Sequence, residues 1–93
     1  MKKYHLGIDA MVNKEIGDYL LRKVLLKLPQ MMEMKVLSRP LIRKGNEKLP
    51  GYSGIIMIET SHIAFHSFDK EKKLWIDILS CRKFDKKDII SYL

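Results

Sequence analysis

Three strand-like runs follow one another closely in the second half of this 93-residue chain, and their spacing constrains its fold more than any other feature. They cover Ile55 to Glu59, His62 to Phe68 and Leu74 to Ser80. Each run is rich in β-branched and aromatic residues, and only a few residues separate one run from the next. Such short connections favour hairpins, in which neighbouring strands are antiparallel. We therefore expect an antiparallel sheet in this half of the chain.

The first half predicts another strand, a helix and a weaker strand. Apolar and polar residues alternate from Tyr4 to Ala10, as in a half-buried strand. Asn13 stands where a helix cap belongs, and Pro29 stands where the helix would end. Met34 to Leu41 is the weaker strand candidate. Apolar residues at helical spacing lie between the cap and the proline: Ile16, Leu20, Leu21, Val24, Leu25 and Leu28.

The remaining segments complete an α+β pattern. Arg43 to Gly51 reads as a polar loop, and Asp85 is placed to cap a short final helix. The expected order is one strand, one helix, four strands and one helix. We expect a two-layer α+β sandwich, with a mainly antiparallel sheet, two helices on one face, and the other face packing in a dimer.

Length and composition narrow the class of protein. Residues 1–93 are expected to form one domain whose thin core favours a partner subunit, such as a second copy in a homodimer. The one cysteine excludes an internal disulfide. The first residues lack an apolar stretch typical of a signal peptide or membrane helix, so we expect a cytoplasmic protein without membrane contact. The net charge of +7 is spread over all segments, which favours a solvated basic surface.

The register of the last hairpin decides which polar residues meet. If residues 69 to 72 form the turn, Phe68 faces Lys73, and counting outward places Cys81 opposite Thr60, next to Ser61. His66 is five residues from Ser61, or roughly 16 Å along an extended strand. It therefore cannot touch Ser61 of the same chain, and would have to reach the serine of a neighbouring subunit.

Side-chain alternation also assigns the faces of this strand. His62, Ala64, His66 and Phe68 share one face, and Ile63 with its neighbours of the same parity points to the other, where helices should pack. We expect the histidine face to be the dimer face. The two histidines lie roughly 13 Å apart, too far to share an ion, so no metal site is expected.

Simpler readings of single residues remain open. Ser61 alone could be a turn residue, and Cys81 alone could be a small buried apolar side chain. The aromatic residues Phe65, Phe68 and Trp75 could form a stacking platform for single-stranded nucleic acid. No glycine-aromatic signature of a recognition motif accompanies them, so nucleic acid ranks below a small-molecule substrate.

Polar residues at fixed spacing point to a family. Ser53-Gly54 opens an apolar strand, Ser61-His62 begins the next, His66 follows four residues later, and Asp77 precedes Cys81 by four. This pattern, close over about a third of the chain, resembles the small prokaryotic S-adenosylmethionine decarboxylases. The resemblance implies a proenzyme that cleaves itself between residues 60 and 61 and converts the serine to a pyruvoyl cofactor. It also implies sites shared between the two subunits of a homodimer.

The resemblance implies a role for each matched residue. Ser61 would be the pyruvoyl precursor, His66 the base in processing, and Ser53 a hydrogen-bonding support for the acyl shift. Cys81 would return a proton to the substrate. The pyruvoyl carbonyl would condense with the substrate amine and accept the electrons released as carbon dioxide leaves.

Two positions depart from the pattern. Thr60 stands where the family has glutamate. Phe68-Asp69-Lys70 stands where the family has Trp-Pro-Glu, whose acid is expected to hold the ribose hydroxyls, so Phe68, Asp69 and Glu71 are candidate substrate contacts.

Two functions are therefore open. The first is a pyruvoyl-dependent S-adenosylmethionine decarboxylase of polyamine and spermidine biosynthesis, with an amino acid such as arginine as a lesser substrate option. The second is a non-processing homologue that acts as a binding or regulatory subunit.

Overall fold

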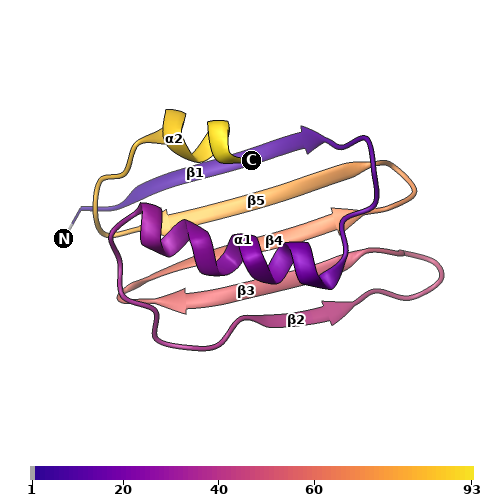
Figure 1. Ribbon diagram of the computed structural model, residues 1–93, viewed down its shortest axis with the longest axis horizontal. Helices are drawn as coiled ribbons and strands as arrows, with labels where there is room; N and C mark the ends of the chain where they lie inside the picture. The colour runs from indigo at the N-terminus through magenta and orange to yellow at the C-terminus, as the bar shows by residue number, and fades with distance from the viewer. Residues whose placement is uncertain (1) are drawn as a thin grey trace.

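The computed structural model describes residues 2–93, which form both strands and helices (Figure 1). The strands form a five-stranded antiparallel sheet in the order β1-β5-β4-β3-β2. The predicted order of strands and helices along the chain is confirmed. Their bounds are β1 Tyr4–Met11, α1 Asp18–Met31, β2 Leu41–Lys44, β3 Tyr52–Ile58, β4 Ser61–Phe68, β5 Lys73–Ser80 and α2 Lys86–Tyr92.

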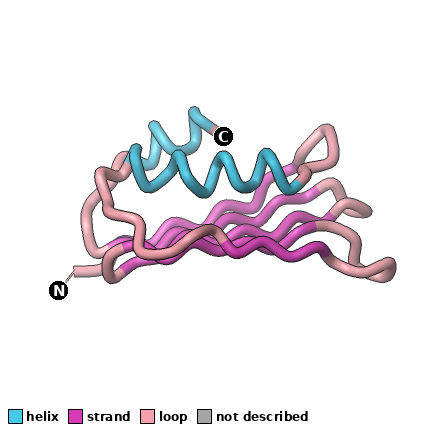
Figure 2. Tube along the Cα trace, turned by 60° about the horizontal axis from the view of Figure 1, so that its bottom comes forward, coloured by secondary structure: helices cyan, strands magenta, loops and turns pink. Residues whose placement is uncertain are grey.

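Both helices cover one face of the sheet, and the opposite face carries neither helix (Figure 2). This two-layer α+β arrangement agrees with the prediction. Burial alternates along β4, where Ile63 and Phe65 are buried beneath the helices, while His62 and His66 lie on the uncovered face. The uncovered face, which carries these two histidines, is the open face of the sheet.

The core lies between α1 and the middle of the sheet. Its helical part consists of Leu21, Leu25 and Leu28, all at most 1% exposed. Gly54 in β3 allows the helix to approach closely, because a Cβ there would lie 3.1 Å from Leu25 Cδ1 and 3.3 Å from Ile42 Cγ1. The strands contribute Ile42, Ile56, Ile58, Ile63, Phe65, Leu74, Ile76 and Ile78.

The predicted ends of the long helix are wrong. Asn13 does not cap it, because the chain needs residues 12–17 to pass from β1 at one edge of the sheet onto the covered face, where α1 contacts β3 and β2. The helix begins after Gly17, and Pro29 lies inside its last turn. Pro29 lies two residues before the end of the helix, so little helix follows the backbone hydrogen bond that it cannot donate. Helix α1 ends just before Glu33, whose φ of +55° lies outside the right-handed helical region.

The weaker strand is also displaced from its predicted place. The edge strand is Leu41–Lys44, so it takes the first two residues of the expected loop. Most of Met34 to Leu41 is not a strand, although Val36 makes an isolated bridge to Ile58. Leu41 to Lys44 pair here because the edge of β3 is available to them.

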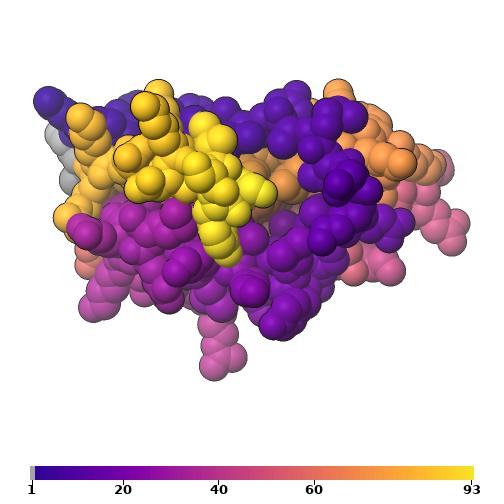
Figure 3. All heavy atoms as spheres, turned by 45° about the horizontal axis from the view of Figure 1, so that its top comes forward, coloured from indigo at the N-terminus to yellow at the C-terminus, as the bar shows by residue number. Residues whose placement is uncertain are grey.

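The C-terminal helix follows the prediction at its start. The Asp85 carboxylate accepts a hydrogen bond from the Lys87 backbone amide at 2.8 Å. The helix packs beside α1 on the covered face through buried Ile89, and Figure 3 shows the end of the chain lying against α1. Within residues 2–93, neither helix combines the length and apolar character needed to cross a bilayer.

Candidate active site

Thr60, Ser61 and Cys81 lie together at one end of the sheet. Thr60 completes the tight turn between β3 and β4, and Ser61 is the first residue of β4. The Cys81 backbone amide donates to Ser61 Oγ at 2.9 Å, and Thr60 Oγ1 lies 2.8 Å from Cys81 Sγ. The register of β4 with β5 pairs Phe68 with Lys73, as predicted, and it has no bulge. Counting along this ladder therefore located the contact between residues 60 and 81 correctly.

The environment of the Cys81 sulfur favours its charged form. The Thr60 hydroxyl, followed by the Ser61 hydroxyl, lowers the pKa of the thiol below its ordinary value. Partial burial acts in the opposite direction, and the neighbouring Arg82 guanidinium adds a small lowering effect. A thiol with a lowered pKa in a partly exposed position is available for proton transfer.

The backbone at Thr60 is strained. Its φ is +51°, in the left-handed region that β-branched residues rarely adopt. Such a conformation costs about 1–3 kcal/mol and persists only where the surrounding structure enforces it. The Thr60 hydroxyl also lies 2.7 Å from the Glu59 carbonyl oxygen. The strain therefore lies immediately before the Thr60–Ser61 peptide bond.

Ser53 and His66 form a second group. They face each other across β3 and β4, and Ser53 Oγ lies 2.7 Å from His66 Nδ1. Both side chains are on the open face, whereas Ser61 is only 7% exposed and has the parity of the covered face. Ser61 and His66 thus lie near opposite ends of β4 and do not meet within one chain.

Shallow pockets on the open face connect these two groups. A pocket of about 520 Å³ lies beside the cleavage candidate, lined by Ser38, Arg39, Leu41, Ile55, Met57, Thr60, Ser61 and His62. A second pocket, of about 240 Å³, shares Leu41 and Ile55 with the first and reaches Ser53 and His66. The open face therefore offers a continuous, partly apolar path from one group to the other.

Comparisons with known proteins identify the family of this chain. A family profile described as S-adenosylmethionine decarboxylase matches residues 11–93. The chain belongs to the S-adenosylmethionine decarboxylase family. It is 30% identical over 95 aligned residues to the S-adenosylmethionine decarboxylase proenzymes of Clostridium botulinum strains Langeland, Okra and Hall, which covers 97% of this chain and 78% of each relative. No solved structure gives a significant match.

This family is one of carboxy-lyases, so membership assigns the chain to an enzyme family. The match extends well beyond the stretch from Ser53 to Cys81 that carries the sequence pattern, and it includes α1 and α2. The resemblance inferred from a third of the chain is therefore confirmed over most of it.

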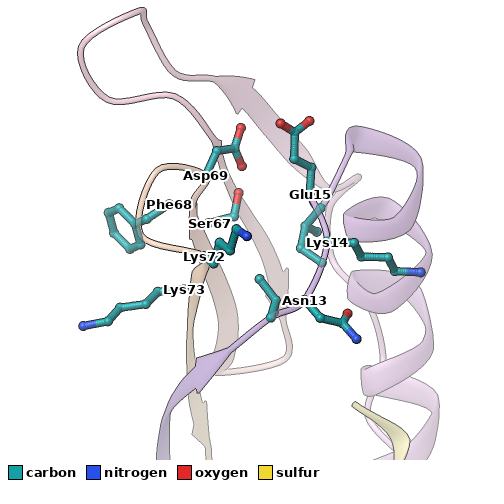
Figure 4. Close-up of a pocket in the computed structure, with 10 residues that line it drawn as sticks. Asn13, Lys14, Glu15, Ser67, Phe68, Asp69, Lys72 and Lys73 are labelled. Carbon is teal, nitrogen blue, oxygen red and sulfur yellow. The ribbon is translucent and has the colours of Figure 1, made fainter.

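The three candidate substrate contacts of this S-adenosylmethionine decarboxylase homologue lie apart. Phe68 lies on the open face, with its ring centroid 4.6 Å from that of Trp75 in an edge-to-face arrangement. Asp69 lines a pocket of about 250 Å³ between the β4–β5 turn and the segment after β1, and Phe68 also contributes to its lining. Figure 4 shows Asp69 near Glu15, with the Phe68 ring on the far side of the turn. Glu71 is exposed in the turn. The three side chains thus do not line one pocket.

The lysine that replaces the family acid is turned toward the neighbouring loop. Lys70 Nζ donates to the Lys48 backbone carbonyl at 3.4 Å. The position at which the resemblance led us to expect an acid is thus occupied by a cation that binds backbone.

A cluster on the open face was not predicted from the sequence. The Asp77 carboxylate contacts His5 Nε2 through one oxygen, and its other oxygen lies 3.5 Å from His62 Nε2. The two histidines belong to β1 and β4, which flank β5. The cluster depends on the strand order, which the local sequence pattern does not give. The register is consistent with it, since His5 and His62 both pair with Leu79 of β5.

Proposed function

We propose that this chain is the proenzyme of a pyruvoyl-dependent S-adenosylmethionine decarboxylase and cleaves itself between Thr60 and Ser61. The observation that carries the proposal is the meeting of Thr60, Ser61 and Cys81 at the start of β4. Family membership supports the reaction class. The strained backbone immediately before Ser61 supports the position of cleavage.

Cleavage begins with the side chain of Ser61. Its Oγ attacks the Thr60 carbonyl carbon, and the peptide C–N bond breaks as an ester forms. A base then removes the Ser61 α-proton, and the Cβ–Oγ bond breaks, so that the oxygen leaves as part of a Thr60 carboxylate. The dehydroalanine left at position 61 tautomerises to an imine, and water hydrolyses it with release of ammonia to leave a pyruvoyl group.

The residues at the start of β4 fit this group. The Ser61 hydroxyl is held by a backbone amide next to the scissile bond, and a thiol of lowered pKa lies within hydrogen-bond distance of Thr60. When formed, the pyruvoyl carbonyl supplies an electron sink for loss of carbon dioxide from a bound amine. Cys81 is the proton donor to the substrate carbon.

The complete site requires a homodimer. His66 is the base for processing and Ser53, 2.7 Å from its imidazole, supports the acyl shift, but both are remote from Ser61 of their own chain. The open face carries both residues and large exposed apolar side chains, which favours pairing of two open faces. Such pairing brings His66 of one subunit toward the open-face pocket of the other, which Thr60 and Ser61 line. The exposed apolar residues on this face are Leu41, Ile55, Met57 and Trp75.

The substrate is S-adenosylmethionine, and its decarboxylated product feeds polyamine and spermidine biosynthesis. Phe68 and Trp75 form an aromatic surface on the open face that suits a planar base. With Lys70 in place of the family acid, Asp69 and Glu71 are the nearest acids in sequence for ribose hydroxyls. An assay of carbon dioxide release from S-adenosylmethionine and from arginine decides between the two substrates.

The test of processing is the mass of the denatured protein after long incubation, with and without hydrazine. Processing yields fragments 1–60 and 61–93, and the second fragment gains mass with hydrazine because it carries a ketone. Ser61→Ala should remain uncut and inactive, whereas Cys81→Ala should be cleaved but decarboxylate poorly. Equal activity of wild type and Ser61→Ala would exclude the pyruvoyl mechanism.

A second candidate is a non-processing homologue that binds or regulates a partner. The uncharged Thr60 in place of the family glutamate favours it. A single uncut mass in wild type, together with no reaction with hydrazine, would select this function.

A further inference from the structure

The Thr60 hydroxyl has two acceptors but a single proton. Its oxygen lies 2.8 Å from Cys81 Sγ and 2.7 Å from the Glu59 carbonyl oxygen, and Cys81 Sγ lies 3.8 Å from that same carbonyl. When the sulfur is a thiolate, the hydroxyl proton points to it. When the sulfur is a thiol, the hydroxyl turns to the carbonyl and the S–H becomes the donor. The hydroxyl thus responds to the charge of Cys81.

A second hydroxyl stabilises the same thiolate. Ser61 Oγ accepts from the Cys81 amide and, after Thr60, is the next cause of the lowered pKa of the thiol. Among the described residues, the charged group that acts on this pKa is the Arg82 guanidinium, and it also lowers it. Compared with an ordinary thiol, Cys81 of the uncut chain is therefore shifted toward the thiolate, which opposes its role as a proton donor.

We propose that Thr60 is a positioning residue that sets the charge of Cys81 in two stages: its hydroxyl favours the thiolate in the uncut chain, and cleavage after it favours the thiol. The second stage rests on the cleavage proposed above. Thr60 stands where the sequence resemblance led us to expect glutamate, so the proposed role is that of a residue that departs from the expected pattern.

The atoms that move during cleavage account for the second stage. Attack by Ser61 Oγ and breakage of its Cβ–Oγ bond transfer that oxygen to the Thr60 carbonyl carbon. Residue 61 loses its hydroxyl, while Thr60 gains a carboxylate next to the hydroxyl that contacts the sulfur. A negative charge beside a thiol raises its pKa, and loss of the Ser61 hydroxyl removes a lowering contact. Both changes favour the protonated thiol at the stage when a proton donor is needed.

Alkylation of Cys81 by iodoacetamide, followed against pH, tests both stages. Cys81 is the single cysteine of the chain, so the rate reports this thiolate alone. His66→Ala provides the uncut form, since its cleavage site is intact but its base is missing. In that background, Thr60→Val should slow alkylation about tenfold below the ordinary thiol pKa, as expected for one lost hydrogen bond to a charged group. Thr60→Ser keeps the hydroxyl and should restore the rate.

The cleaved wild type should react more slowly than the uncut form at the same pH, with its midpoint shifted upward. Equal profiles for Thr60 and Thr60→Val would overturn the first stage, and a cleaved form with an unchanged or lower midpoint would overturn the second. A wild type that never cleaves overturns the proposed function and the second stage with it. The comparison with Thr60→Val still decides the first stage in that case.

Discussion

Ser53 Oγ lies 2.7 Å from His66 Nδ1 on the open face, at the end of β4 remote from Ser61. This pair is suitably exposed to act on another molecule and is too far away to act on Ser61 of its own chain. In the proposed mechanism His66 therefore acts on Ser61 of another subunit, so processing depends on assembly of the dimer.

Mixing two defective variants tests this assembly. Neither Ser61→Ala nor His66→Ala alone should be cleaved. After they are unfolded together and refolded at equal amounts, about half of the dimers are mixed, and each mixed dimer contains one complete site. Mass spectrometry should then find cleavage of the His66→Ala chain, which keeps its serine, and not of the Ser61→Ala chain. Verified mixed dimers without cleavage would contradict a shared site.

A charge placed on the open face should separate the subunits. Ile55 is 43% exposed on this face, so Ile55→Glu leaves the core of each subunit intact but places a carboxylate in the proposed interface. We expect a monomer by light scattering and loss of self-cleavage. Leu26 on α1 is a matched control, since it is also 43% exposed but lies on the helical layer. A dimer that survives Ile55→Glu and fails with Leu26→Glu would place the interface on the helices.

Strain at Thr60 should contribute to the cleavage rate. Thr60→Val and Thr60→Gly both lose the hydroxyl, but only glycine adopts a φ of +51° without strain. Thr60→Gly should therefore exceed Thr60→Val in free energy of unfolding by about 1 kcal/mol, and it should cleave more slowly. Urea unfolding of uncut protein and the time course of cleavage measure the two effects. Glu33→Gly, at a φ of +55° away from the scissile bond, should stabilise the fold and leave the cleavage rate unchanged.

The contact between α1 and β3 should tolerate no added methyl group. Gly54→Ala places a Cβ 3.1 Å from Leu25 Cδ1, so it should lower the free energy of unfolding by about 1 kcal/mol or more. Gly7→Ala is the control within another strand, because its Cβ would meet nothing nearer than 4.0 Å. Similar unfolding curves for the two variants would show that the helix can move away from Gly54.

Local pattern predicted the hairpins of the second half and the contact between Thr60 and Cys81, because an unbulged ladder can be counted from its turn. It failed where the structure depends on distant pairing. The start of α1 is set by the distance from β1 across the sheet, and β2 forms at Leu41–Lys44 because β3 offers an edge. The His5–Asp77 contact likewise requires β1 to lie beside β5, which no local periodicity reveals.

The strand order determines what cleavage after Thr60 would leave behind. Fragment 61–93 contains β4 and β5, which lie between β1 and β3 of fragment 1–60. Two ladders of backbone hydrogen bonds, β1 with β5 and β3 with β4, would join the fragments after the covalent link is lost. The products would form an interleaved noncovalent complex that separates only on unfolding. Fragment 1–60 alone would have a sheet that lacks its two middle strands, so the chain must fold before it is cut.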